Sequence, residues 1–168
     1  RIISLVDGNF RGQGVVIEVE SRGDKRCCGY PNGYGQVILN LLLNARDAIQ
    51  ERAVQDGWIE VRSWQEGDRT VLTVTDNAGG IDEAIIDRIF DPYFTTKQPG
   101  KGTGIGLFMS KALVEKSMGG ELTVRNTGLG AEFRVELACA PEETPAVMGE
   151  EGGGPLNPNL GHGDTEKI

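Results

Sequence analysis

The sequence lacks the features that mark membrane segments, disulfide-rich scaffolds and nucleic-acid-binding domains. No stretch approaches the roughly 18 consecutive apolar residues of a membrane span, and no signal peptide opens the chain. Three cysteines, two of them adjacent, form neither a disulfide framework nor a metal-ligand spacing, so we expect reduced thiols. With 17 Lys+Arg against 25 Asp+Glu, the chain is a poor match for nucleic acid or an anionic membrane. We expect a cytoplasmic domain excised from a longer protein, which would carry any membrane anchor.

The acidic residues gather toward one end. Residues 139–168 hold six Asp+Glu and one Lys, and ten of these 30 residues are Gly or Pro. Such a stretch buries too little apolar surface to order itself. We therefore predict one domain over residues 1–138 and a flexible acidic tail over residues 139–168.

The periodicity of the apolar residues predicts the elements of that domain. Strands are expected at 15–20, 59–63, 71–74, 121–126 and 132–137, with hairpin turns at 66–68 and 128–130. Helices are expected at 36–52, ended by Gly57, at 82–88, with Asp82 as N-cap, and at 105–118. Phe10 and Trp58 are interpreted as packing residues. The pattern favours an α/β two-layer sandwich, in which about three helices cover one face of a mixed, mostly antiparallel sheet of about five strands.

A polar stripe interrupts the apolar pattern of the long helix. It consists of Gln36, Asn40, Asn44 and Asp47. Spacings of four, four and three residues place these side chains on one helix face. A solvated face is the simplest explanation, but leucines surround the stripe and asparagine is a mediocre helix former. These observations favour a bound ligand over water as the hydrogen-bond partner of the two asparagine amides.

Two glycine-containing segments carry further signals. In residues 76–81 (DNAGGI), an aspartate after a strand could accept a hydrogen bond from a ligand amine, although a plain turn explains the segment equally well. In residues 100–107 (GKGTGIGL), alternating glycines open a helix and offer backbone N–H groups to phosphates, with Lys97 and Lys101 adding charge. A flexible linker would not be followed at once by a helical pattern. The segment fits neither the dinucleotide fingerprint nor the P-loop, because no strand precedes it and Lys101 stands before the last glycines.

In order, these segments resemble the nucleotide-binding motifs of the family that unites DNA gyrase, the Hsp90 chaperone, sensor histidine kinases and the MutL repair protein. Residues 36–49 resemble the N box, 76–81 the G1 box, 89–97 the F box, 102–107 the G2 box and 128–133 the G3 segment. The resemblance covers residues 28–138 and implies the Bergerat ATP-binding fold.

The resemblance also implies a division of roles within a nucleotide site. Asn44 would ligate a Mg²⁺ ion that bridges the phosphates, Asn40 and Lys97 would position phosphate, and Asp76 would accept a hydrogen bond from the adenine amine. Asp47 stands where many family kinases have a lysine, so a structural role for it stays open. The implied nucleotide-binding residues are Asn40, Asn44, Asp47, Asp76, Gly80, Ile81, Tyr93, Phe94, Lys97, Lys101, Gly102, Thr103, Gly104, Ile105, Gly106 and Leu107.

Within the family, the sequence resembles the kinases more than the ATP-hydrolysing members. Those members carry a glutamate as general base where this chain has Asn40, and an amide cannot take up the proton. In the G3 segment, Ala131 and Glu132 replace small hydroxyl residues, which puts a water-mediated contact to adenine in doubt.

The resemblance therefore implies the catalytic ATP-binding domain of a two-component sensor histidine kinase. It would bind Mg·ATP and pass the γ-phosphoryl group to a histidine on a separate dimerisation domain, with a response-regulator receiver domain downstream and a homodimeric full-length protein. His162, the only histidine, is not expected to be the acceptor because nothing holds it on a helix. The alternatives are a serine-directed kinase or anti-sigma switch on the same fold, and a nucleotide-gated adaptor without transfer activity.

Overall fold

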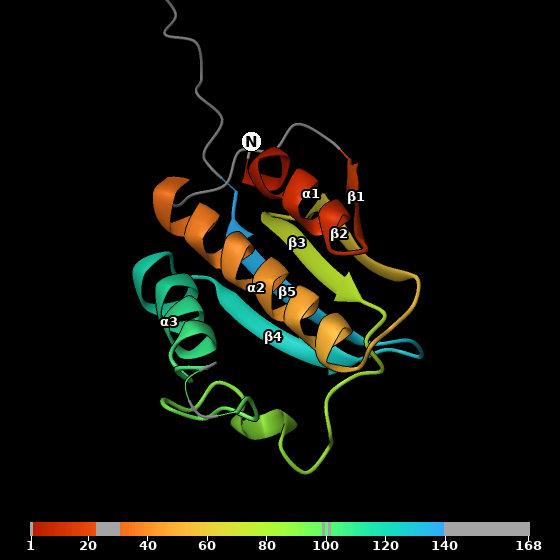
Figure 1. Ribbon diagram of the computed structural model, residues 1–168. Helices are drawn as coiled ribbons and strands as arrows, with labels where there is room; N and C mark the ends of the chain where they lie inside the picture. Colours follow the sequence, from red (N-terminus) through yellow and green to blue (C-terminus); the bar gives the residue numbers. More distant parts are fainter. Residues whose placement is uncertain (1, 23–30, 99, 101, 140–168) are drawn as a thin grey trace, which may run out of the picture.

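A computed structural model describes residues 2–22, 31–98, 100 and 102–139 of the chain. Five strands form one sheet in the order β1-β2-β3-β5-β4 (Figure 1). The strands are β1 (Val15–Ser21), β2 (Gly57–Glu66), β3 (Arg69–Asp76), β4 (Glu121–Asn126) and β5 (Ala131–Ala138). β1 runs parallel to β2 and every other neighbouring pair is antiparallel, so the predicted mixed, mostly antiparallel sheet is confirmed.

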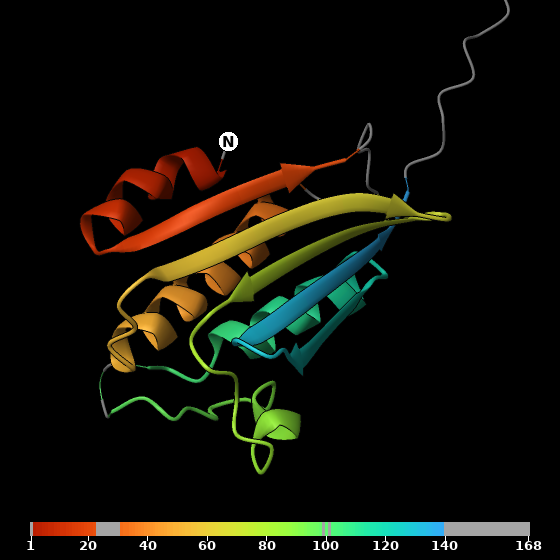
Figure 2. The same ribbon diagram turned by 90° about the vertical axis from the view of Figure 1, so that its right-hand side faces the viewer.

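The helices lie on one side of this sheet and leave its other face uncovered (Figure 2). They are α1 (Ile2–Gly12), α2 (Pro31–Glu51) and α3 (Gly106–Ala112), which continues into a π-helical turn, η2 (Leu113–Ser117). A single 3-10 turn, η1 (Ile86–Arg88), lies between β3 and α3. This arrangement confirms the predicted two-layer sandwich with three covering helices.

The alternation of residues along the strands explains why only one face is covered. Val61, Val74 and Phe133 are cross-strand neighbours on the helix side and are buried. The next residues along β2 and β5, Arg62 and Arg134, lie on the open face among other charged side chains. Along β2 and β5 this alternation buries one face and hydrates the other, whereas every residue of β3 after Arg69 is buried.

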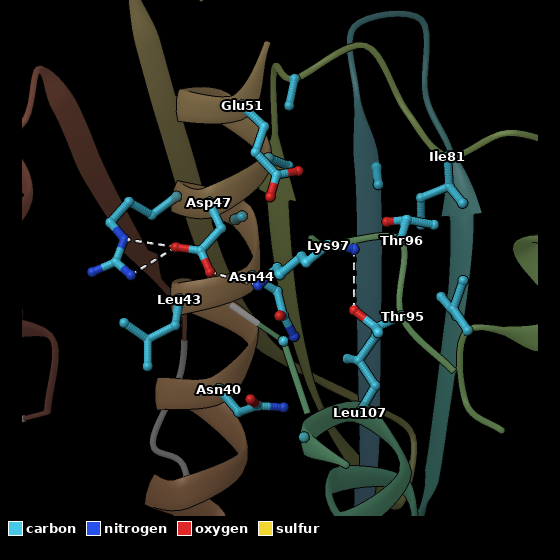
Figure 3. A pocket seen from close by; sticks show the side chains of 18 of the residues that line it. Asn40, Leu43, Asn44, Asp47, Glu51, Ile81, Thr95, Thr96, Lys97 and Leu107 are labelled. Carbon is cyan, nitrogen blue, oxygen red and sulfur yellow. Dashed lines mark hydrogen bonds and ion pairs between the residues drawn. The ribbon is translucent and has the colours of Figure 1, made fainter. Parts of the chain in front are cut away.

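Helix α2 determines where the site lies. Its buried face contacts the sheet through Ile38, Leu41, Leu42, Ala45 and Ile49, as the periodicity predicted. Three residues of the polar stripe, Asn40, Asn44 and Asp47, lie beside this face and point toward the segment between β3 and α3 (Figure 3), whereas Gln36 is exposed and is not among them.

The first departure from the predicted elements is α1, which the sequence reading did not identify. Its stability comes from packing: Phe10 is fully buried, as expected, with the Arg46 guanidinium 5.4 Å from its ring centre. The second is the helix expected at 82–88, where only Ile86–Arg88 form a helical turn. Asp82 does accept the N–H of Ala84 at 2.9 Å, but the turn it starts does not continue into an α-helix.

The end of the long helix also differs from the prediction. Gly57 does not end α2, because the helix stops at Glu51 and Ala53 adopts a positive φ of 50°. Gly57 instead opens β2, where a Cβ atom would lie 2.5 Å from Cγ2 of Ile49. This glycine is therefore needed for close packing between strand and helix.

Several predictions concern residues outside the described ranges, namely Cys27, Cys28, Lys101, His162 and the tail beyond Cys139. Within the part of the chain that the structure describes, no helix is long and apolar enough to cross a membrane.

Candidate functional site

A cavity of about 400 Å³ lies between α2, the ends of β3 and β5, and the segment that leads into α3 (Figure 3). Its volume falls within the range of small-ligand sites, roughly 300–1,000 Å³. The cavity brings together all three segments that the sequence analysis singled out. The predicted site residues that line it are Asn40, Asn44, Asp47, Asp76, Gly80, Ile81, Phe94, Lys97, Gly102, Thr103, Gly104, Gly106 and Leu107.

Three predicted site residues are not placed on the cavity wall. Lys101 lies outside the described residues, and Ile105 does not line the cavity. Tyr93 is 78% exposed, and its backbone has a positive φ of 64°. Its N–H donates to the carbonyl of Gly104 at 2.9 Å, so Tyr93 shapes the loop from outside the cavity.

Asp76 is the buried carboxylate of the cavity, only 4% exposed at the end of β3. Its Oδ1 accepts the N–H groups of Ala78 at 2.8 Å and Ala131 at 3.3 Å, which fixes the orientation of the carboxylate. Burial raises the pKa of Asp76, an effect that these two hydrogen bonds and the charge of Arg52 only partly offset. Because both described hydrogen bonds end on Oδ1, the second oxygen is available to accept a hydrogen bond from a ligand.

Asn40 is held at the opposite end of the cavity, where α2 meets α3. Its Nδ2 donates to Oγ of the buried Ser110 at 2.9 Å. A Cβ atom on Gly106 would lie 2.6 Å from Oδ1 of Asn40, so the glycine lets the start of α3 approach this amide closely. The Asn40 side chain is thereby oriented before any ligand binds.

The side chain of Asn44 carries a buried nitrogen atom that has no hydrogen-bond partner in the described ranges of the chain. Its Nδ2 makes no hydrogen bond within the described part of the structure. Such an orphaned group is uncommon in native proteins and costs free energy, which indicates a ligand or bound water. The oxygen and nitrogen of an amide exchange places by a half-turn, so Asn44 can present an oxygen to a cation. No cluster of three His, Cys, Asp or Glu occurs among the described residues.

A lysine and an aspartate meet across the cavity. Nζ of Lys97 lies 2.5 Å from Oδ2 of Asp47, and each side chain is about one quarter exposed, at 22% and 25% (Figure 3). Oδ1 of Asp47 also accepts hydrogen bonds from Nε and Nη2 of Arg46 at 3.0 and 2.7 Å. Burial opposes ionisation of Asp47, but hydrogen bonds from Lys97 and Arg46 outweigh it and hold its pKa below the usual value. The segment carrying Lys97 is thus fastened to α2.

Sequence reasoning missed some residues of the site. Arg52 donates through Nη1 to the carbonyl of Ala78 at 2.5 Å and so supports the loop after β3. In the G3 segment, Ala131 lines the cavity, whereas Glu132 points to the open face and pairs with Arg125 at 2.6 Å. The alternation of β5, in which Ala131 and Phe133 are buried and Glu132 is not, carried this last signal.

Residues 29–141 match the sequence profile of the family described as histidine kinase-, DNA gyrase B- and HSP90-like ATPases. The chain belongs to this family. The match covers the polar stripe of α2, both glycine-containing segments and the last hairpin. The membership confirms the resemblance drawn from the motifs.

The individual relatives include a two-component sensor and a histidine kinase. The two-component sensor PprA of Pseudomonas aeruginosa is 44% identical over an alignment of 128 positions that covers 68% of this chain and 12% of that protein. The nucleotide-free catalytic domain of histidine kinase ThkA superposes with a TM-score of 0.73 at 27% identity, covering 84% of this chain and 90% of that one. Histidine kinase ThkA in complex with the response regulator protein TrrA gives a TM-score of 0.67 at 25% identity, covering 84% and 39%. The chain therefore spans about one eighth of the length of the relative PprA.

Proposed function

We propose that this chain is the catalytic ATP-binding domain of a two-component sensor histidine kinase. It binds Mg·ATP and transfers the γ-phosphoryl group to a histidine on a dimerisation domain of the same protein. The observation that carries the proposal is the convergence, in one cavity, of a buried carboxylate, an unpartnered buried amide and a glycine-rich helix start.

The carboxylate end of the cavity suits adenine. Oδ2 of Asp76 accepts a hydrogen bond from the exocyclic amine, while Oδ1 stays with the backbone N–H groups of Ala78 and Ala131. Guanine carries a carbonyl at that position, which would face the carboxylate without a proton between them. A site built to hydrogen-bond one edge rejects a ligand that lacks the matching group, so ATP is favoured over GTP.

The amide end suits the phosphates. Asn44 supplies an oxygen ligand for Mg²⁺, which neutralises charge on the phosphates, and Asn40 contacts phosphate or its water shell. Lys97 reaches the phosphates after leaving Asp47, exchanging one anionic partner for another. The backbone N–H groups of residues 102–106 complete a cradle at the start of α3. Phosphoryl transfer depends mainly on such positioning and charge compensation.

Hydrolysis of ATP by this chain is expected to be slow. Asn40 lies at the phosphate end and is an amide bound to Ser110, so it cannot act as a general base toward water. The described residues contain no histidine, and the nucleophile is therefore assigned to a histidine of the dimerisation domain. A homodimeric protein and a response-regulator receiver domain complete the proposed assembly.

The test uses the full-length protein that contains this domain, incubated with Mg²⁺ and γ-labelled ATP. Phosphate that is labile in acid and stable in alkali identifies phosphohistidine and supports the proposal. Acid-stable phosphate would instead identify a serine-directed kinase, and tight ATP binding without any label would identify an adaptor. The Asp76→Asn protein serves as the control for labelling that does not depend on the cavity.

A further inference from the structure

Asn126, the last residue of β4, holds the loop that follows β3. Its Oδ1 accepts the N–H of Ile81 at 2.7 Å, and its Nδ2 donates to the Ile81 carbonyl at 2.7 Å and to Oε1 of Glu83 at 2.7 Å. One side-chain amide thus satisfies both backbone groups of Ile81, as an adjoining strand would. It joins segments that lie 45 residues apart in the sequence.

The contact lies directly against the cavity. A Cβ atom on Gly80 would come within 2.8 Å of Oδ1 of Asn126, and both Gly80 and Ile81 line the cavity beside Asp76. The loop is also held at two other points, because Arg52, just after α2, donates to the carbonyl of Ala78, and the Gly79 N–H donates at 2.8 Å to the carbonyl of Leu129 in the β4–β5 turn. Side chains and backbone therefore fix residues 78–81 before any ligand binds.

We propose that Asn126 is a positioning residue for the base end of the site. It sets the backbone of Gly80 and Ile81 at the distance that the adenine ring requires, and so makes this half of the site preformed. The phosphate half differs, since Lys97 must first leave Asp47. Because the residues of this half are already ordered in the free protein, ligand binding there loses less conformational entropy. The inference rests on the proposed function, because it takes adenine as the ligand of this wall.

The test compares Asn126→Ala with Arg125→Ala. Arg125 is the preceding residue of β4, and its side chain is 73% exposed on the open face, paired with Glu132. Calorimetry on the complete chain gives the Kd of ATP and of ADP. Asn126→Ala should weaken both nucleotides by the same factor, about five-fold, which corresponds to the net contribution of one hydrogen bond. Arg125→Ala should leave both values unchanged.

A second substitution tests the donor side of the amide. Asn126→Asp keeps an acceptor for the Ile81 N–H but turns an oxygen toward the Ile81 carbonyl and the Glu83 carboxylate. Its loss of affinity should equal or exceed that of Asn126→Ala. Hydrogen exchange of the Ile81 amide in the wild-type chain should be as slow as in the β4–β5 ladder, a measurement that does not depend on how well the variants fold.

Three results overturn the inference. They are unchanged nucleotide affinity in both Asn126 variants, a loss confined to ATP, and an Ile81 amide that exchanges like an unstructured peptide. If the wild-type chain binds both nucleotides and either of the first two results occurs, the inference fails alone. If the wild-type chain binds neither nucleotide, the proposed function fails as well.

Discussion

Replacing Asp76 by asparagine should weaken ATP binding without unfolding the domain. The two side chains have the same shape, and Oδ1 of the asparagine still accepts the N–H groups of Ala78 and Ala131. At the second position, an NH₂ group replaces the oxygen that we propose accepts a hydrogen bond from the adenine amine, so two donors would face each other. Loss of a charge-assisted hydrogen bond costs about 1.5–3 kcal/mol. The Kd of ATP should therefore rise roughly 10- to 150-fold.

The same Asp76→Asn substitution should leave the stability of the folded domain unchanged or increase it. Burial raises the pKa of Asp76 in the folded state, so the folded protein holds this proton more tightly than the unfolded chain does. Stability from this group is consequently lost as the pH rises from its unfolded pKa through its folded pKa. The asparagine removes that penalty at neutral pH, and the thermal midpoint should stay the same or rise.

Calorimetry with ATP and ADP measures the affinities, and scanning fluorimetry measures the midpoint. The matched control is Asp87→Asn, which also removes one negative charge but from an exposed side chain that does not line the cavity. An Asp76→Asn protein that is folded and binds ATP within two-fold of wild type would refute the assignment of Asp76 to the base.

Three further predictions concern the rest of the cavity. Asn44→Ala should flatten the dependence of ATP affinity on Mg²⁺ concentration, whereas an identical metal titration would remove Asn44 from the ligands of the ion. Asp47→Asn frees Lys97 from a quarter-exposed ion pair worth roughly 0.5–1 kcal/mol, so ATP binding should tighten about two- to five-fold; weaker binding would mean that Asp47 itself assists the phosphates. A ¹³C titration should place the carboxyl pKa of Asp76 above the ordinary value of about 3.9 in the free domain and lower it when ADP binds. By linkage, ADP affinity should fall as the pH drops through the free-state pKa, and affinity that Asp76→Asn leaves equally pH-dependent would contradict this.

The sheet and the long helix were predictable because their signal is periodic. The buried face of α2 and the alternation of β2 and β5 follow from residue spacing alone. Helix α1 was missed although Ile3, Val6 and Phe10 have helical spacing and pack on the core, because its segment also contains two glycines, Ser4 and Asp7. It forms because Phe10 and its neighbours pack on the core, and tertiary packing supplies most helical stability in proteins.

The members of the site were predictable from motifs, but their partners were not. The sequence placed Lys97 near phosphate, whereas the structure pairs it with Asp47, which lies 50 residues earlier. The hydrogen bonds of Asn126 to Ile81 likewise join distant segments through the order of β3, β5 and β4. Such pairings depend on how the elements pack, and no local pattern carries them.

The most direct measurement is a crystal structure of the domain with Mg²⁺ and a non-hydrolysable ATP analogue. We expect the adenine amine against Asp76, the ion on Asn44 and the Lys97 ammonium transferred from Asp47 to the triphosphate. A nucleotide bound outside this cavity, or one whose base lies at the Asn44 end, would contradict the account.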